Sequence, residues 1–266
     1  DGNYPTGTDN VALGNTALDS VEAGGDNNVA IGDNSLTANT TGAGNTAVGK
    51  DSLISNTTGS TNTAVGLCSL NANTTADNNT AVGRGALKLN TTGASNVGVG
   101  RNALEANTDT SFNVAVGVDA LKTNDADANT ALGYVALCSN TTGTTNVAVG
   151  RSALCKNTTA SSNTAVGSNS LRANTTGASN TSVGSSALIA NTTGTANTAV
   201  GANALDANIS GIRNTAIGLS SLSANTTGGC NTAIGTYALE ANTTGGNNTA
   251  IGYYTLLGNL TGANNT

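Results

Sequence analysis

Short apolar stretches alternate with polar, glycine-containing stretches along the whole chain. A tetrapeptide of the type Thr/Val-Ala-Val/Ile/Leu-Gly occurs fifteen times, and its glycines are 17 residues apart, except for one step of 18 and one of 16. We call these the repeat glycines: Gly14, Gly32, Gly49, Gly66, Gly83, Gly100, Gly117, Gly133, Gly150, Gly167, Gly184, Gly201, Gly218, Gly235 and Gly252. A fixed short period is typical of a solenoid, in which each repeat forms one coil that stacks on the next.

Within one repeat, the order of residues predicts two short strands and two corners. Thr46-Ala47-Val48 alternates β-branched and small residues, which is the pattern of a strand. Gly49 then allows a tight corner, and Ser52-Leu53 is expected to form a second strand. The second corner is predicted at 56–59, Asn-Thr-Thr-Gly, because these residues favour turns. Frequent glycine, asparagine and threonine argue against a helix.

Three positions of the repeat are nearly constant along the chain. Asparagine lies four residues before every repeat glycine, leucine lies four after every one, and asparagine lies seven after fourteen of the fifteen. Equivalent positions of successive coils stack ~4.8 Å apart, so apolar columns should form the core and asparagine columns should form hydrogen-bonded ladders. The predicted core comprises Val48, Leu53, Val65, Leu70, Val82, Leu87, Val166 and Leu171, and the predicted asparagine ladders include Asn45, Asn62, Asn79, Asn56, Asn73 and Asn90.

The sequence thus predicts an all-β, parallel β-solenoid of about fifteen 17-residue coils. It is expected to be a single repeat domain, 1–266, with coils from about residue 10 and a lead-in at 1–9. The final Asn265-Thr266 begins another repeat, which favours an excerpt of a longer or processed chain.

Composition narrows the function classes further. The chain has five Tyr, one Phe, and no Trp, Met or His, so any core must be thin. Its net charge is −6 and its nine basic residues are scattered, which argues against a nucleic-acid partner. No apolar stretch is long enough to span a membrane, so no membrane insertion is expected.

Two columns of small residues favour association between chains. Burial of one Val or Ile and one Leu per coil looks too small to order seventeen residues unaided. The small residues lie three after the repeat glycine (Ala17, Ser35, Ser52) and two before it (Ala12, Ala30, Ala47). If these columns form outer faces, neighbouring chains can approach closely, and the sequence predicts a homotrimer.

The repeat carries a family likeness. The segment 163–184, NTAVGSNSLRANTTGASNTSVG, resembles the head repeats of trimeric autotransporter adhesins and, more closely, the repeat arrays of phage and prophage tail-fibre proteins. The resemblance covers about residues 10–266 and implies a left-handed β-roll wound as a trimer, on a virion or cell-surface fibre. No coiled-coil stalk, membrane anchor or C-terminal chaperone or receptor-binding domain of the full-length family pattern is recognised in these 266 residues, so the resemblance alone does not predict specific attachment.

Candidate chemistry is sparse. The absence of histidine excludes Ser-His, Cys-His and His-metal constellations, so the chain is predicted not to be an enzyme and to need no cofactor or metal. Asp125-x-Asp127-x-Asn129 is similar to the start of a calcium loop, but Thr130 stands where glycine is expected, which favours a solvated acidic turn.

A few side chains remain as candidates for cross-linking or surface contact. Cys138 and Cys155 share one position in adjacent coils, so either a disulfide or two thiols is possible there. Exposed tyrosines could contact a glycan or partner: Tyr134, Tyr237, Tyr253 and Tyr254. The Asn-Thr-Thr corners match the N-glycosylation pattern, but a role in the turn and its ladder is favoured.

These features predict a structural fibre segment, extracellular or on a virion, that self-associates as a trimer or stacks head to tail. The alternative is an adhesin head that binds a host-surface or glycan receptor. An ice-binding solenoid is disfavoured, because the strand is Thr-Ala-Val rather than a Thr-x-Thr row.

Overall fold

The computed structural model describes residues 7–266 and contains two compact units, unit 1 (Asp1–Asn129) and unit 2 (Thr130–Thr266). The strands of unit 1 are β1 (Val11–Leu13), β2 (Val29–Ile31), β3 (Thr46–Val48), β4 (Thr63–Val65), β5 (Thr80–Val82), β6 (Val97–Val99) and β7 (Val114–Val116). The strands of unit 2 are β8 (Thr130–Leu132), β9 (Val147–Val149), β10 (Thr164–Val166), β11 (Thr181–Val183), β12 (Thr198–Val200), β13 (Thr215–Ile217), β14 (Thr232–Ile234) and β15 (Thr249–Ile251).

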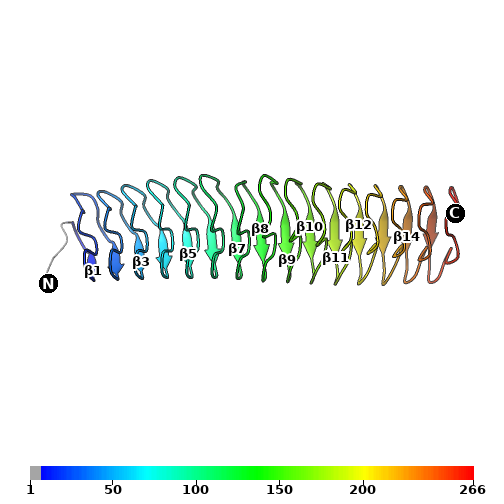
Figure 1. Cartoon of the computed structure of the whole chain (residues 1–266), viewed down its shortest axis with the longest axis horizontal. Coiled ribbons are helices and arrows are strands. Elements are labelled where there is room, and N and C mark those ends of the chain that lie inside the picture. Colours follow the sequence, from blue (N-terminus) through cyan, green and yellow to red (C-terminus); the bar gives the residue numbers. More distant parts are fainter. Residues whose placement is uncertain (1–6) are drawn as a thin grey trace. The chain divides into compact units, whose positions relative to one another are not determined.

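Within each unit, the strands of successive coils pair in parallel. The register follows the repeat, so Thr46, Ala47 and Val48 of β3 lie opposite Thr63, Ala64 and Val65 of β4. In unit 2, β9 pairs with β10 and β10 with β11 in the same way. Figure 1 shows the strands of each unit side by side on one face, with loops completing the coils. The predicted all-β parallel solenoid is confirmed.

The direction in which the strand side chains point differs from the prediction. Ala47 is fully buried, whereas Thr46 and Val48 beside it are only half-buried. The reason lies in the asparagine that precedes each strand: Asn45 points inward, and side chains alternate along a strand. Alanine, two residues later, therefore also points inward, and threonine and valine point outward.

Half of the predicted core must be corrected accordingly. The Leu column, four residues after each repeat glycine, is fully buried at Leu53, Leu70, Leu87 and Leu171, as predicted. The predicted valines Val48, Val65, Val82 and Val166 lie on the outer face, where Val82 is 36% exposed. The core consists instead of the Leu column, the Ala column two residues before each repeat glycine, and the column of Ala and Ser three residues after it.

Both small-residue columns lie inside the coil, so they offer no outer surface to another chain. Ala47, Ser52 and Ala86 have no exposed surface. Small side chains are needed there because they face the leucines across a narrow interior. Ser182 takes the place of alanine in the Ala column; it accepts a hydrogen bond from Ser170 Oγ at 2.7 Å and donates one to the Ala187 carbonyl at 2.9 Å. The predicted reason for trimer formation is therefore wrong.

The segment around Leu53 is a series of turns rather than the expected second strand. Asp51 and Leu53 have φ of 54° and 51°, in the left-handed region. Their N–H groups point to opposite neighbours: Asp51 donates to Asp33 of the preceding coil at 2.9 Å, and Leu53 donates to Ser69 of the following coil at 3.0 Å. Left-handed residues reverse successive peptide groups, so this wall of the coil bonds to both neighbours without strand geometry.

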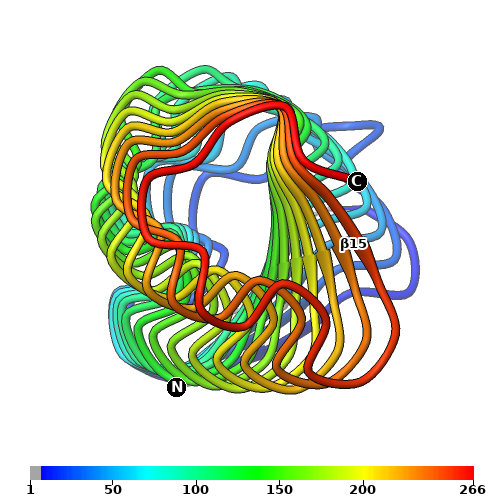
Figure 2. The same cartoon turned by 90° about the vertical axis from the view of Figure 1, so that its right-hand side faces the viewer.

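The two predicted asparagine ladders are present. Four residues before the repeat glycine, Asn45 Oδ1 accepts the backbone N–H of Asn62 at 2.9 Å. Seven residues after the glycine, Asn56 Nδ2 donates to Asn39 Oδ1 at 2.8 Å. The Gly59 carbonyl accepts from Asn56 and from Asn45, which joins the ladders within each coil. In Figure 2 the strand forms one straight side of the β15 coil, and the turns enclose the interior where these side chains lie.

Candidate functional site

A regular surface is formed by the outward side of the strands. We call it the outer sheet face; it consists of the residues one and three before each repeat glycine. The residues one before are Leu13, Ile31, Val48, Val65, Val82, Val99, Val116 in unit 1 and Leu132, Val149, Val166, Val183, Val200, Ile217, Ile234, Ile251 in unit 2. Those three before are threonine or valine. No charged residue occurs at either position, and Val183 and Ile217 are 36% and 39% exposed.

The Cys138–Cys155 pair has the geometry that its shared position predicts. The two Sγ atoms lie 3.0 Å apart, a close contact rather than the ~2.05 Å of a covalent bond. Contact with the Cys138 sulfur, and then burial, raise the pKa of the Cys155 thiol well above its ordinary value. Fewer thiolates form at neutral pH, so exchange into a disulfide should be faster under alkaline conditions.

Oxidised glutathione at mildly alkaline pH is expected to convert Cys138 and Cys155 into an intrachain disulfide. The bond would close a loop between adjacent coils and raise the free energy of unfolding by ~3 kcal/mol, through the restricted unfolded chain. Thiol titration should show two thiols lost, and the melting temperature should rise. Cys138→Ser is the control and should not gain stability; continued titration of both thiols in the wild type would contradict this expectation.

Three of the four candidate tyrosines form a cluster in unit 2. The Tyr237 and Tyr254 rings stack with centroids 4.9 Å apart, and Tyr253 meets Tyr254 edge-on at 4.2 Å. A side-chain hydrogen bond with Tyr253 raises the pKa of the Tyr254 phenol. Tyr253 is 68% exposed, so the cluster presents an aromatic surface. Tyr134, 56% exposed, lies six coils away from Tyr237 and contributes nothing to this cluster.

The acidic turn of unit 1 is occupied by contacts with the preceding coil. Asp125 Oδ1 accepts from the Thr108 hydroxyl at 2.8 Å, and Asp127 Oδ1 accepts from the Ser111 N–H at 2.7 Å. Asn129 is buried in the asparagine ladder and does not point toward these carboxylates. Across residues 7–266, no three His, Cys, Asp or Glu side chains gather where they could hold a metal ion.

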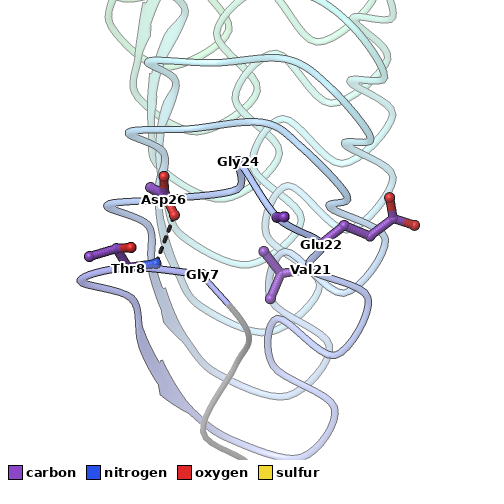
Figure 3. Close-up of a pocket in the computed structure, with 7 residues that line it drawn as sticks. Gly7, Thr8, Val21, Glu22, Gly24 and Asp26 are labelled. Atoms are coloured by element: carbon purple, nitrogen blue, oxygen red, sulfur yellow. Dashed lines mark hydrogen bonds between the residues drawn. The ribbon is translucent and has the colours of Figure 1, made fainter.

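Two hollows of the described surface are lined partly by polar and charged side chains. One lies beside the 18-residue step, lined by Gly7, Thr8, Val21, Glu22, Ala23, Gly24 and Asp26. Figure 3 shows Glu22 pointing away from it, while Asp26 accepts a hydrogen bond from the Thr8 N–H at 2.7 Å. A second is lined by Leu67, Cys68, Arg84, Gly85, Lys88, Asn102 and Glu105. In the second, Cys68, Lys88 and Glu105 supply a thiol, an ammonium and a carboxylate, and Glu105 is ion-paired with Lys122 at 3.7 Å.

Ionisable side chains whose pKa departs from its ordinary value are dispersed along the chain. The Lys50 ammonium, 3.0 Å from the Asp33 carboxylate, lowers the pKa of Asp33, and Asp33 in turn raises the pKa of Lys50. Burial raises the pKa of Asp206. The Lys122–Glu105 ion pair, at 3.7 Å, joins adjacent coils in one surface column. These exposed pairs support the register weakly, since surface ion pairs contribute little to stability.

The asparagines of the Asn-Thr-Thr corners are structural. Asn56 and Asn73 are fully buried, and each uses its Nδ2 group for two hydrogen bonds. A glycan on Nδ2 would replace one of these hydrogens and could not fit between coils. In the folded protein these side chains therefore belong to the ladder.

Comparison with known proteins leaves the chain without an assigned relative. No family model matches it, and no curated protein matches it. In the described part of the chain, no helix has the length and apolarity to cross a membrane.

Proposed function

We propose that this chain is a non-enzymatic structural segment of an extracellular fibre, on a virion tail or a microbial surface appendage. The observation that carries the proposal is that both units are built from one coil whose backbone and buried asparagines bond to the coils on either side. Each added coil lengthens a unit by ~4.8 Å without enclosing a binding site. Length and stiffness, rather than chemistry, are what this construction provides.

Self-association belongs to the same proposal, as a homotrimer, as head-to-tail stacks, or as both. The sequence resemblance supports the trimer, although the small-residue columns cannot form its interface because they are buried. A nucleic-acid partner and membrane insertion are not part of the proposal, given the net charge of −6 and the polar composition.

An adhesin head is the second candidate, and the tyrosine cluster is the observation that favours it. Exposed aromatic rings can pack against the apolar faces of sugar rings, and Tyr253 offers such a surface. A receptor that is a host-surface glycan would be recognised in this way.

Electron microscopy and a glycan array distinguish the two functions. The fibre proposal expects unbranched, elongated particles of uniform width and no saturable glycan binding. Saturable binding that is lost in Tyr253→Ala, but kept in Tyr134→Ala, would replace the fibre proposal with the adhesin. Compact particles of varied shape would contradict the fibre proposal directly.

A further inference from the structure

The outer sheet face is more uniform than strand formation requires. All fifteen residues directly before the repeat glycines are Val, Ile or Leu. The residues three before are threonine in ten coils, so threonine suits this sheet equally well. The residues directly after the repeat glycines are also largely exposed, yet they include Asp33, Lys50, Arg84 and Ser185. The position directly before the repeat glycine faces solvent and is aliphatic in every repeat, and strand propensity alone does not explain this.

The size and charge of this face fit a protein interface. Three residues per strand give a width of ~10 Å, and coils ~4.8 Å apart give ~340 Å² for unit 1 and ~380 Å² for unit 2. The face combines the aliphatic column with threonine or valine, and its area is similar to that of the largest apolar patch on a typical soluble monomer, which is often functional. The face carries no charge, although the chain has a net charge of −6. Two copies could meet here without opposing their like charges.

The spacing of the face identifies the partner. Neighbouring aliphatic residues, such as Val149, Val166 and Val183, are held in register by the parallel pairing of β9, β10 and β11. A partner stays in step with such a face over many coils only if it has the same repeat. We propose that a second copy of this chain covers the outer sheet face, sheet against sheet, with the aliphatic side chains of the two copies interdigitating. This inference rests on the proposed fibre function; because each copy has one outer sheet face, it joins copies in pairs and is an alternative to the homotrimer.

The experiment compares two triple variants of unit 2 by light scattering after gel filtration. Val149→Lys/Val166→Lys/Val183→Lys places three charges on the outer sheet face. Ser168→Lys/Ser185→Lys/Ala202→Lys places the same charges directly after the repeat glycines, where Arg84, Arg101 and Arg151 already occur. The wild type and the control are expected to share one multimeric mass, and the face variant is expected to fall toward the 25.7 kDa of one chain.

A conservative variant separates loss of contact from loss of fold. Val149→Thr/Val166→Thr/Val183→Thr keeps side-chain shape and strand propensity, and should fold with an unchanged circular dichroism spectrum while associating at least tenfold more weakly. The proposal is overturned if the wild type is a single chain, or if the folded threonine variant keeps the wild-type affinity. If the wild type is a single chain and its solution shows thermal hysteresis, the outer sheet face would be an ice-binding surface instead. If electron microscopy shows elongated particles of the folded threonine variant, the fibre function is supported independently of whether the proposed interface is correct.

Discussion

Replacing Gly49 with alanine is expected to lower the free energy of unfolding by ~3–5 kcal/mol. Gly49 has a φ of 131°, which side-chain-bearing residues avoid, and a Cβ added there would lie 2.7 Å from the carbonyl oxygen of Gly66. The added Cβ is fixed by the backbone of residue 49, and the carbonyl oxygen belongs to the backbone of Gly66. Both backbones are held between coils, so neither atom can move aside. Every repeat glycine in the chain has a φ between 126° and 142°, so the same corner recurs in each coil. Chemical denaturation followed by circular dichroism measures the loss.

Gly44→Ala is the matched control. Gly44 also has a positive φ, 68°, but a Cβ there would meet only the Thr61 methyl at 3.6 Å. Ala128 and Ala196 occupy the same position of other coils with φ of 59° and 57°. A loss within ~1 kcal/mol is therefore expected for Gly44→Ala. Equal losses in the two variants would show that the close approach of successive corners does not govern stability.

Asn191→Asp is expected to cost ~3–5 kcal/mol at neutral pH, because it buries an uncompensated charge inside an asparagine ladder. Asn191 Nδ2 donates to Asn174 Oδ1 at 2.9 Å and to the Gly194 carbonyl at 3.1 Å. A carboxylate oxygen in that place would face two acceptors, and only the bond from Asn208 Nδ2 to Asn191 Oδ1 could remain. Asn203→Asp, at an exposed position that Asp51 and Asp119 occupy in other coils, is the control and should be nearly neutral.

The pH dependence of Asn191→Asp tests the same cause. Burial among acceptors should raise the pKa of the introduced carboxyl in the folded state above its unfolded value of ~3.9. The folded protein then holds the proton more tightly, so stability relative to wild type should fall as the pH rises from ~3.9 through the folded pKa. A stability difference that does not change with pH would show that the carboxyl is exposed to water.

The period of the sequence was sufficient to predict the stacking, the position of the one strand in each coil and both asparagine ladders. Asn45, Leu53 and Asn56 represent positions at which the same residue type recurs in nearly every repeat. In a solenoid, residues at equivalent positions stack on one another, so the period alone predicts which side chains are neighbours. The pairing of Cys138 with Cys155 as neighbours follows from the same rule, since both occupy one position in adjacent coils.

The assignment of Val48 to the core failed because hydrophobicity was given more weight than alternation. Asn45 and Ala47 lie two residues apart and both point inward, which leaves Val48 outside. The buried ladder at Asn45 could have settled the question, had its inward direction been used to fix the direction of the strand. The turns at Asp51 and Leu53 could not be anticipated, because leucine rarely adopts a positive φ and nothing in its identity signals one. The stacking of Tyr237 on Tyr254 could have been predicted from the period, since both lie two residues after a repeat glycine in successive coils.

An experimental density map with resolved side chains tests the central claim most directly, namely that alanine and leucine fill each coil while the valines before the repeat glycines point outward. We expect Leu154, Leu171 and Leu188 to lie directly above one another in a dry interior. They should face Ala148, Ala165 and Ser182, and Val149, Val166 and Val183 should lie on the opposite side of the sheet. A map with these valines packed against the leucines, and the alanines outside, would contradict it.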